Sequence, residues 1–126
     1  MSWEELKWGK VIKNSKIPKY LSIFINIYAI TIFPFIIFSD KGNVVTLNHE
    51  RIHIRQQLEL LVVGFYFLYV IFWLIGLLKN IKSQDRFQLA YSYIPFEKEA
   101  YANEKEFIYI LHRKPYSWIE YIGDKI

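Results

Sequence analysis

The chain contains no cysteine and little glycine, proline or methionine. Its 126 residues include 5 glycines, 4 prolines and 1 methionine. The absence of cysteine excludes a disulfide framework, a thiolate zinc site and a thiol nucleophile. A metal ion must therefore be held by histidine, aspartate, glutamate or water, and only 3 histidines are present. The length fits a single domain spanning residues 1–126.

Apolar residues are abundant. They make up 53% of the chain, and aromatic residues make up 19%. A soluble domain is usually about 45–50% apolar. The formal net charge is +4, and a group of lysines precedes the first apolar run. This placement favours a basic flank facing membrane lipid and argues against a nucleic-acid partner. These lysines are Lys7, Lys10, Lys13, Lys16 and Lys19.

Two apolar runs without charge predict two long helices. Leu21–Phe38 and Leu60–Leu78 both approach the roughly 20 residues that a membrane crossing needs. We expect one apolar helix over about 20–38, which Pro34 kinks or ends early. We expect the other over about 46–79, because no helix breaker separates its polar first turns from the second run. Glycines in that run are compatible with close helix packing.

The C-terminal third predicts two amphipathic helices. Pro95 is well placed just before the first turn of a helix over about 96–113, which Lys114-Pro115 ends. A last short helix over about 116–122 suits a membrane interface, with Trp118 as one anchor. The fold class is therefore all-α, in a small integral or monotopic membrane protein.

Residues 49–53 match the H-E-x-x-H pattern of zinc peptidases. On a helix, His49 and His53 lie on one face, so both imidazoles can reach one metal ion. Glu50 lies about 100° round the helix and can act as a base on a metal-bound water. Gln56 lies on this face and Gln57 flanks it, and each either hydrogen-bonds a ligand or substrate or is a solvated or capping glutamine. The alternative for the whole motif is a solvated helix turn with two histidines.

A catalytic zinc site needs a third protein ligand. His112 lies beside two basic residues, which disfavour a cation. Glu97 and Glu99 are better candidates, but they diverge by about 200° on a helix, so at most one can face the metal. The small Ala100 beside Glu97 allows close approach to the histidine helix, which favours Glu97. The alternative is that both glutamates lie on the surface.

The two motifs together resemble those of the gluzincin-type metallopeptidases. His49-Glu50-Arg51-Ile52-His53 is followed by Gln56-Gln57 and later by Glu97-Lys98-Glu99-Ala100. This pattern is similar to membrane zincins of the prenyl-protein-protease and heat-shock-protease group. It also resembles small bacterial zincin-like proteins with H-E-x-x-H-x-x-Q-Q and E-x-E-A motifs. The resemblance covers about residues 46–104.

The resemblance implies zinc as cofactor and a zincin-like active-site helix. It implies His49, His53 and Glu97 as zinc ligands and Glu50 as general base. The membrane proteases usually carry aspartate after the alanine, thought to steady a ligand histidine, whereas this chain has Tyr101. The sequence does not choose an oxyanion donor among Tyr91, Tyr93, Tyr101 and His112.

Besides a soluble or peripheral protein whose aromatic surface binds lipid, two functions remain open. One is a zinc metallopeptidase of the bacterial inner membrane, acting on a peptide or protein substrate. The other is a non-catalytic subunit, a degenerate zincin, that assembles with a larger membrane complex. The second arises because a membrane-crossing Leu60–Leu78 would place His49 and Glu97 on opposite sides. The two motifs can meet if residues 80–96 run back along the helix, if the apolar segments lie in one leaflet, or if protein covers the second apolar helix.

Overall fold

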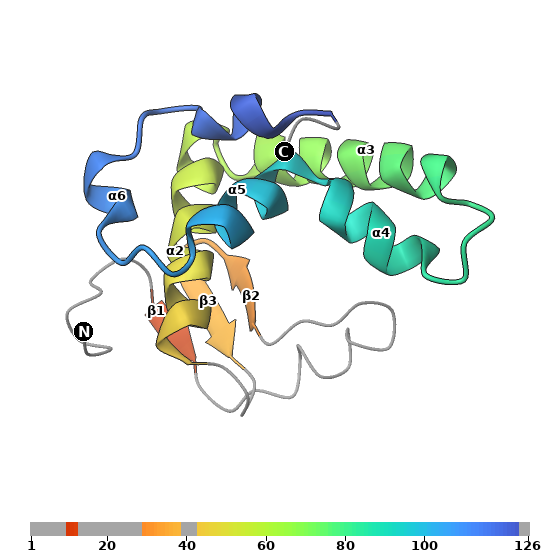
Figure 1. The fold of residues 1–126 in the computed structure, drawn as a ribbon. Coiled ribbons are helices and arrows are strands. Elements are labelled where there is room, and N and C mark those ends of the chain that lie inside the picture. The colour runs from red at the N-terminus through yellow and green to blue at the C-terminus, as the bar shows by residue number, and fades with distance from the viewer. Residues whose placement is uncertain (1–9, 13–28, 39–42, 124–126) are drawn as a thin grey trace.

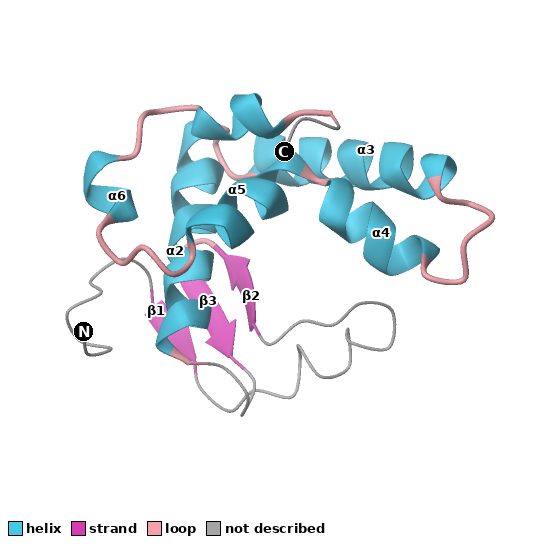
Figure 2. Cartoon of the chain, in the orientation of Figure 1, coloured by secondary structure: helices cyan, strands magenta, loops and turns pink. Residues whose placement is uncertain are grey.

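The structure, a computed structural model, describes residues 10–12, 29–38 and 43–123. These residues are mostly helical, as the all-α prediction requires, and a small sheet lies beside the first described helix (Figure 2). The strands are β1 (Lys10–Ile12), β2 (Ala29–Ile32) and β3 (Phe35–Phe38). The helices are α2 (Val44–Glu59), α3 (Val63–Lys79), α4 (Arg86–Tyr93), α5 (Pro95–Asn103), α6 (Tyr109–His112) and the 3-10 helix η2 (Ser117–Tyr121).

The sheet replaces part of the first predicted helix. β2 pairs antiparallel with β3, and β1 pairs parallel with β3 on its other edge. The prediction of one apolar helix over about 20–38 is therefore wrong for residues 29–38, and its residues 20–28 lie outside the described part. A short apolar run rich in isoleucine and phenylalanine suits a strand as well as a helix. Pro34 lies in the turn between β2 and β3 rather than at a kink.

The second predicted helix is broken in the middle. α2 begins at the expected cap, where Asn43 Oδ1 accepts a hydrogen bond from the Thr46 N–H at 3.0 Å. The chain then bends by 111° between α2 and α3, and Leu61 and Val62 have φ angles of 57° and 63°. A single helix over about 46–79 is thus wrong. The bend lets α3 pack Phe65 against a cluster from the C-terminal helices instead of extending into solvent.

Among the described helices, none alone has both the length and the apolar character to cross a membrane. α2 and α3 satisfy both criteria only as a pair, across the 111° bend.

α3 and α4 form a helical hairpin that projects from the rest of the molecule (Figure 1). Gly76 lies at their contact, where an added Cβ would lie 2.8 Å from Tyr93 Cβ and 3.0 Å from Ala90 Cα. Gly76 therefore permits the close packing predicted for it, whereas a Cβ at Gly64 would meet only Leu60 Cβ at 3.4 Å. The hairpin returns the chain to α2, so α5 packs on α2. Residues 80–96 do run back along the apolar helix, largely as helix.

The helix predicted over about 96–113 is divided. α5 ends at Asn103, and α6 covers only Tyr109–His112. Asn48 of α2 explains the interruption, because its side-chain amide donates to the backbone oxygens of Glu104 at 2.7 Å and Glu106 at 3.1 Å. These hydrogen bonds hold the residues that follow α5 against α2.

The last predicted helix is present as η2, but its tryptophan is not a surface anchor. Trp118 is buried, and its ring centroid lies 4.9 Å from that of Phe96. Phe96 also contacts Phe65 and Tyr69 of α3. This aromatic cluster joins the C-terminal segment, α5 and α3, and it fixes α5 against its neighbours.

Candidate metal centre

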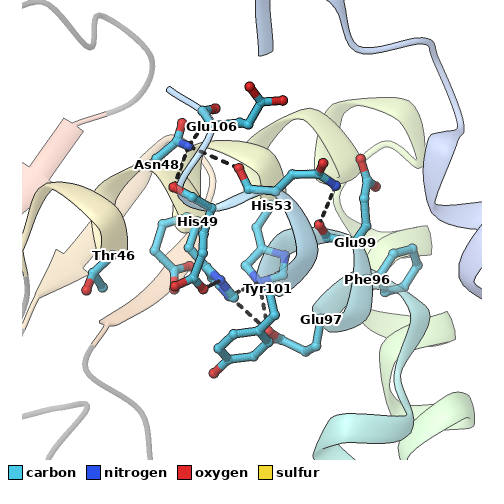
Figure 3. Close-up of polar contacts among 12 residues, drawn as sticks. Thr46, Asn48, His49, His53, Phe96, Glu97, Glu99, Tyr101 and Glu106 are labelled. Atoms are coloured by element: carbon cyan, nitrogen blue, oxygen red, sulfur yellow. Dashed lines mark hydrogen bonds and ion pairs between the residues drawn. The ribbon is translucent and has the colours of Figure 1, made fainter. Parts of the chain in front are cut away.

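His49, His53 and Glu97 meet at the contact between α2 and α5. Glu97 Oε1 lies 3.0 Å from His49 Nε2 and 3.1 Å from His53 Nε2. One ligand atom from each residue lies within 4.8 Å of the others, and all three residues are buried. Figure 3 shows the three side chains pointing toward one another. These residues are therefore close enough to hold a metal ion.

Both imidazoles are held by their outward-facing nitrogen. His49 Nδ1 lies 3.0 Å from Glu104 Oε1, and His53 Nδ1 lies 2.7 Å from Gln56 Oε1. Because each partner atom is an oxygen acceptor, Nδ1 is the donor in each ring. Once the Nε2 protons are lost, the Nε2 lone pairs are directed toward the shared centre, as in metal-binding histidines.

Gln56 contacts His53, as the supporting role predicted for it requires. Its Nε2 donates to the backbone oxygen of Phe96 at 3.1 Å and to Glu99 Oε1 at 2.9 Å. These two acceptors fix the amide so that its oxygen faces His53. The residue is fully buried, so it is not a solvated glutamine.

Two tyrosines hold the Glu97 carboxylate. Tyr91 donates to Oε1 at 2.9 Å, and Tyr69 donates to Oε2 at 2.6 Å. Burial and the Glu97 charge raise the pKa of both tyrosines well above the usual value. Both therefore remain protonated donors. Tyr69 was not predicted, because it lies in the apolar run of α3 and only the 111° bend brings it to the site.

The four candidate oxyanion donors lie in different places, and Tyr91 has been described above. Tyr101 packs edge-on against His49 with ring centroids 4.4 Å apart, and its hydroxyl lies 3.1 Å from that of Tyr91. Tyr93 instead lies beneath the Lys79 ammonium, and His112 packs on Tyr109. Among the four, only Tyr91 and Tyr101 have contacts with the site residues.

A carboxylate steadies His49 despite the tyrosine at position 101. Membrane proteases of the prenyl-protein-protease and heat-shock-protease group usually carry an aspartate at this position. Here Glu104, at the end of α5, contacts His49 Nδ1. Helical spacing places Glu104 on the same face of α5 as Glu97, but only the folded chain shows that its partner is His49.

The charges of the cluster favour a cation at its centre. Burial lowers the pKa of His49, but hydrogen bonds with Glu104 and Glu97 and nearby carboxylate charges raise it more, to about 10. Burial also lowers the pKa of His53, and Glu97 outweighs this effect and raises it. Burial raises the pKa of Glu97, whereas the two imidazoles hold it well below its usual range. The carboxylate therefore stays ionised between two groups that take up positive charge.

Glu50 lies beside the cluster without joining it. It is buried on α2, and its Oε2 accepts a hydrogen bond from Thr31 Oγ1 of β2 at 2.5 Å. Its negative charge contributes to the raised pKa values of His49 and His53. The sheet thus positions the candidate base.

Gln57 faces the sheet rather than the candidate ligands. Its Nε2 donates to the Thr31 backbone oxygen at 3.0 Å, and its Oε1 accepts from the Phe33 N–H at 2.8 Å. Gln57 therefore fastens the β2–β3 hairpin to α2, which holds Thr31 beside Glu50.

Glu99 occupies the opposite side of α5 and is also fully buried. Its carboxylate accepts from Arg113 Nε at 2.5 Å and Arg113 Nη2 at 3.0 Å. Arg113 also binds Glu59 of α2. The preference for Glu97 over Glu99 at the histidines agrees with this geometry, and the alternative that both glutamates are surface residues is wrong.

Comparisons of the chain with protein-family models, with curated proteins and with solved structures find no match. The functional conclusion therefore depends on the site itself: its converging donors, its burial and the side chains that orient them.

Proposed function

We propose that the protein is a zinc-dependent hydrolase of peptide bonds, with His49, His53 and Glu97 as the zinc ligands. The observation that carries this proposal is the convergence of two imidazole nitrogens and one carboxylate oxygen within 4.8 Å at a buried place. Two histidines and a glutamate form a ligand set that zinc uses in hydrolases, and three protein ligands leave a fourth position open. Each ligand also has its own orienting partner, as working metal sites require.

The remaining residues suit hydrolysis by water. Bound zinc supplies Lewis acidity, which lowers the pKa of water toward about 7 and polarises a carbonyl. Glu50, held by Thr31, takes a proton from the attacking water and passes it to the leaving amine. Tyr69 and Tyr91 keep the Glu97 carboxylate in place while this occurs.

One observation favours a second candidate, a non-catalytic subunit that holds a structural metal. His49, His53, Glu97 and Glu50 are each 5% exposed or less. A substrate must reach a catalytic metal, whereas a structural metal needs no access from solvent. The two candidates differ in whether Glu50 is required, since Glu50 is not among the three ligands.

The test uses the purified full-length chain. Zinc content is measured by inductively coupled plasma mass spectrometry, and peptide cleavage is measured on a mixed peptide library. We expect about one zinc per chain, lost in His53→Ala. Glu50→Gln should keep the zinc and lower cleavage by about 10²–10⁴-fold, the usual contribution of a general base.

Glu106→Gln is the matched control, because Glu106 is exposed and should retain both properties. A wild-type chain that binds no zinc after reconstitution would contradict both candidates. Zinc binding without a Glu50-dependent cleavage would favour the structural metal and the non-catalytic subunit.

A further inference from the structure

α3 exposes apolar side chains along one whole face. Val63, Phe67 and Leu78 are 78%, 65% and 72% exposed, and they lie at the start, middle and end of the helix. Other exposed apolar residues lie between them at helical spacing. We define the outer face of α3 as Val63, Phe67, Val70, Ile71, Leu74, Ile75 and Leu78.

The opposite face of α3 is packed in the protein. Tyr69 donates to Glu97, Phe65 is buried in the aromatic cluster, and Gly76 touches α4. These contacts fix the rotation of the helix, so the outer face points away from the core. A helix that is apolar all round needs an apolar environment on every side. The protein supplies that environment on one side of α3.

Charge is confined to one end of this face. The helix carries no charged residue before Lys79, and the following turn contributes the exposed Lys82 and the partly exposed Arg86. Asp85 is the one acidic residue between positions 79 and 86. An apolar surface flanked by cations complements an anionic lipid bilayer, whose headgroups attract lysine and arginine.

We propose that the outer face of α3 lies in one leaflet of a membrane that contains anionic lipid. The helix axis then lies in the plane of the membrane, and Lys79, Lys82 and Arg86 contact headgroups. Lipid fits better than a protein partner because the seven side chains offer no hydrogen-bonding group, whereas protein interfaces carry about one hydrogen bond per 100–200 Å². This surface is independent of the metal centre.

The absence of cysteine makes a direct test possible, because one introduced cysteine carries a fluorescent label at one chosen place. The probe is a vesicle of phosphatidylcholine and phosphatidylglycerol, with nitroxide quenchers on the lipid acyl chains. Labels at Phe67→Cys and Leu74→Cys should be quenched on vesicle binding. The matched control is Leu111→Cys on α6, because Leu111 is 81% exposed and α6 lies on the opposite side of α2 from the α3–α4 hairpin in Figure 1.

A second measurement uses the binding strength. The triple variant Phe67→Asp, Leu74→Asp and Leu78→Asp should weaken vesicle partition by about tenfold or more, since each side chain leaves an apolar environment. Leu111→Asp should leave partition about unchanged. Lys82→Glu should weaken binding to anionic vesicles by roughly fivefold or more, as expected for loss of one cation near the surface. Lys105→Glu is its matched control.

Three results would overturn the proposal. In the first, the full-length chain does not bind the vesicles. In the second, it binds while labels at positions 67 and 74 stay in water, which would assign the binding to another segment. In the third, those labels become shielded without lipid as the protein concentration rises, which would assign the face to a second copy of the chain.

Discussion

The two sides of α5 each bury a carboxylate, and they neutralise it differently. Glu99 meets the guanidinium of Arg113, a permanent cation. Glu97 meets the imidazoles of His49 and His53, whose positive charge depends on bound protons. One helix therefore carries a fixed ion pair on one face and an exchangeable positive charge on the other.

This difference indicates that Glu99 stabilises the fold, whereas Glu97 belongs to the candidate metal centre. A buried carboxylate already paired with arginine has no need of another cation, so Glu99 serves the fold. The cluster around Glu97 can exchange protons for a metal ion without losing its hydrogen bonds from Tyr69 and Tyr91. Gln56 connects the two sides, because it contacts both Glu99 and His53.

The largest expected effect is on the fixed pair. Arg113→Met leaves Glu99 buried without its cation and should lower the free energy of unfolding by about 3–5 kcal/mol. Urea unfolding followed by circular dichroism measures this change. Lys114→Met, at the exposed neighbouring position, should stay within about 0.5 kcal/mol of wild type. Equal stability of Arg113→Met and wild type would remove the distinction between the two sides.

The next effect concerns metal affinity. Glu97→Gln keeps the shape of the side chain but removes its charge, so zinc affinity should fall by about 100-fold or more. This loss exceeds the roughly 10–100-fold expected when a residue that only hydrogen-bonds a ligand is changed. Competition with a chromogenic zinc chelator measures the zinc affinity. Glu99→Gln, measured on the folded fraction, should change it by about tenfold or less. Similar losses of zinc affinity in both variants would contradict the assignment of Glu97, and not Glu99, as the carboxylate ligand.

A smaller effect should follow from loosening His49. Glu104→Gln replaces the acceptor of the His49 Nδ1 proton by an amide and should lower zinc affinity by about 10–100-fold. The same chelator competition applies. Glu106→Gln is the control and should match wild type. An unchanged affinity in Glu104→Gln would mean that the contact with Glu104 does not orient the ligand.

The smallest signal is the release of protons. Because the pKa of His49 is raised to about 10, its imidazole is protonated at neutral pH and must lose that proton to bind zinc. Titration calorimetry in buffers of different ionisation enthalpy should show about one proton or more released per zinc. The number should fall as the pH rises through about 10, and the apparent affinity should rise with pH. No release at neutral pH would contradict the charge state inferred for the Glu97 side.

Local geometry made the centre of the site predictable. The spacing of His49 and His53 depends only on helical periodicity, and α2 is helical throughout this stretch. The preference for Glu97 rested on the small Ala100, which is indeed fully buried and packs in a cluster with Ile52 of α2. These inferences depend only on the helical spacing within α2 and on the close contact between α5 and α2.

Features set by distant contacts were not predictable. Nothing between Leu60 and Val63 marks a helix end, since no glycine or proline is present there. The strands at 29–38 form part of an apolar run that also suits a helix. Tyr69, Glu104 and Arg113 acquire their roles only when the hairpin brings α5 back to α2.

The hairpin of α3 and α4 contacts the metal centre through Tyr69 and Tyr91, whereas its far end projects away from the centre (Figure 1). The chain leaves the site at the bend after α2 and returns to it at α5, so both ends of the hairpin lie at the site. Matched turns added to both helices, about 5.4 Å each, would lengthen the arm and leave Glu97 opposite His53. The length of the arm is therefore set by the parts of α3 and α4 beyond Tyr69 and Tyr91, and not by the residues that hold Glu97.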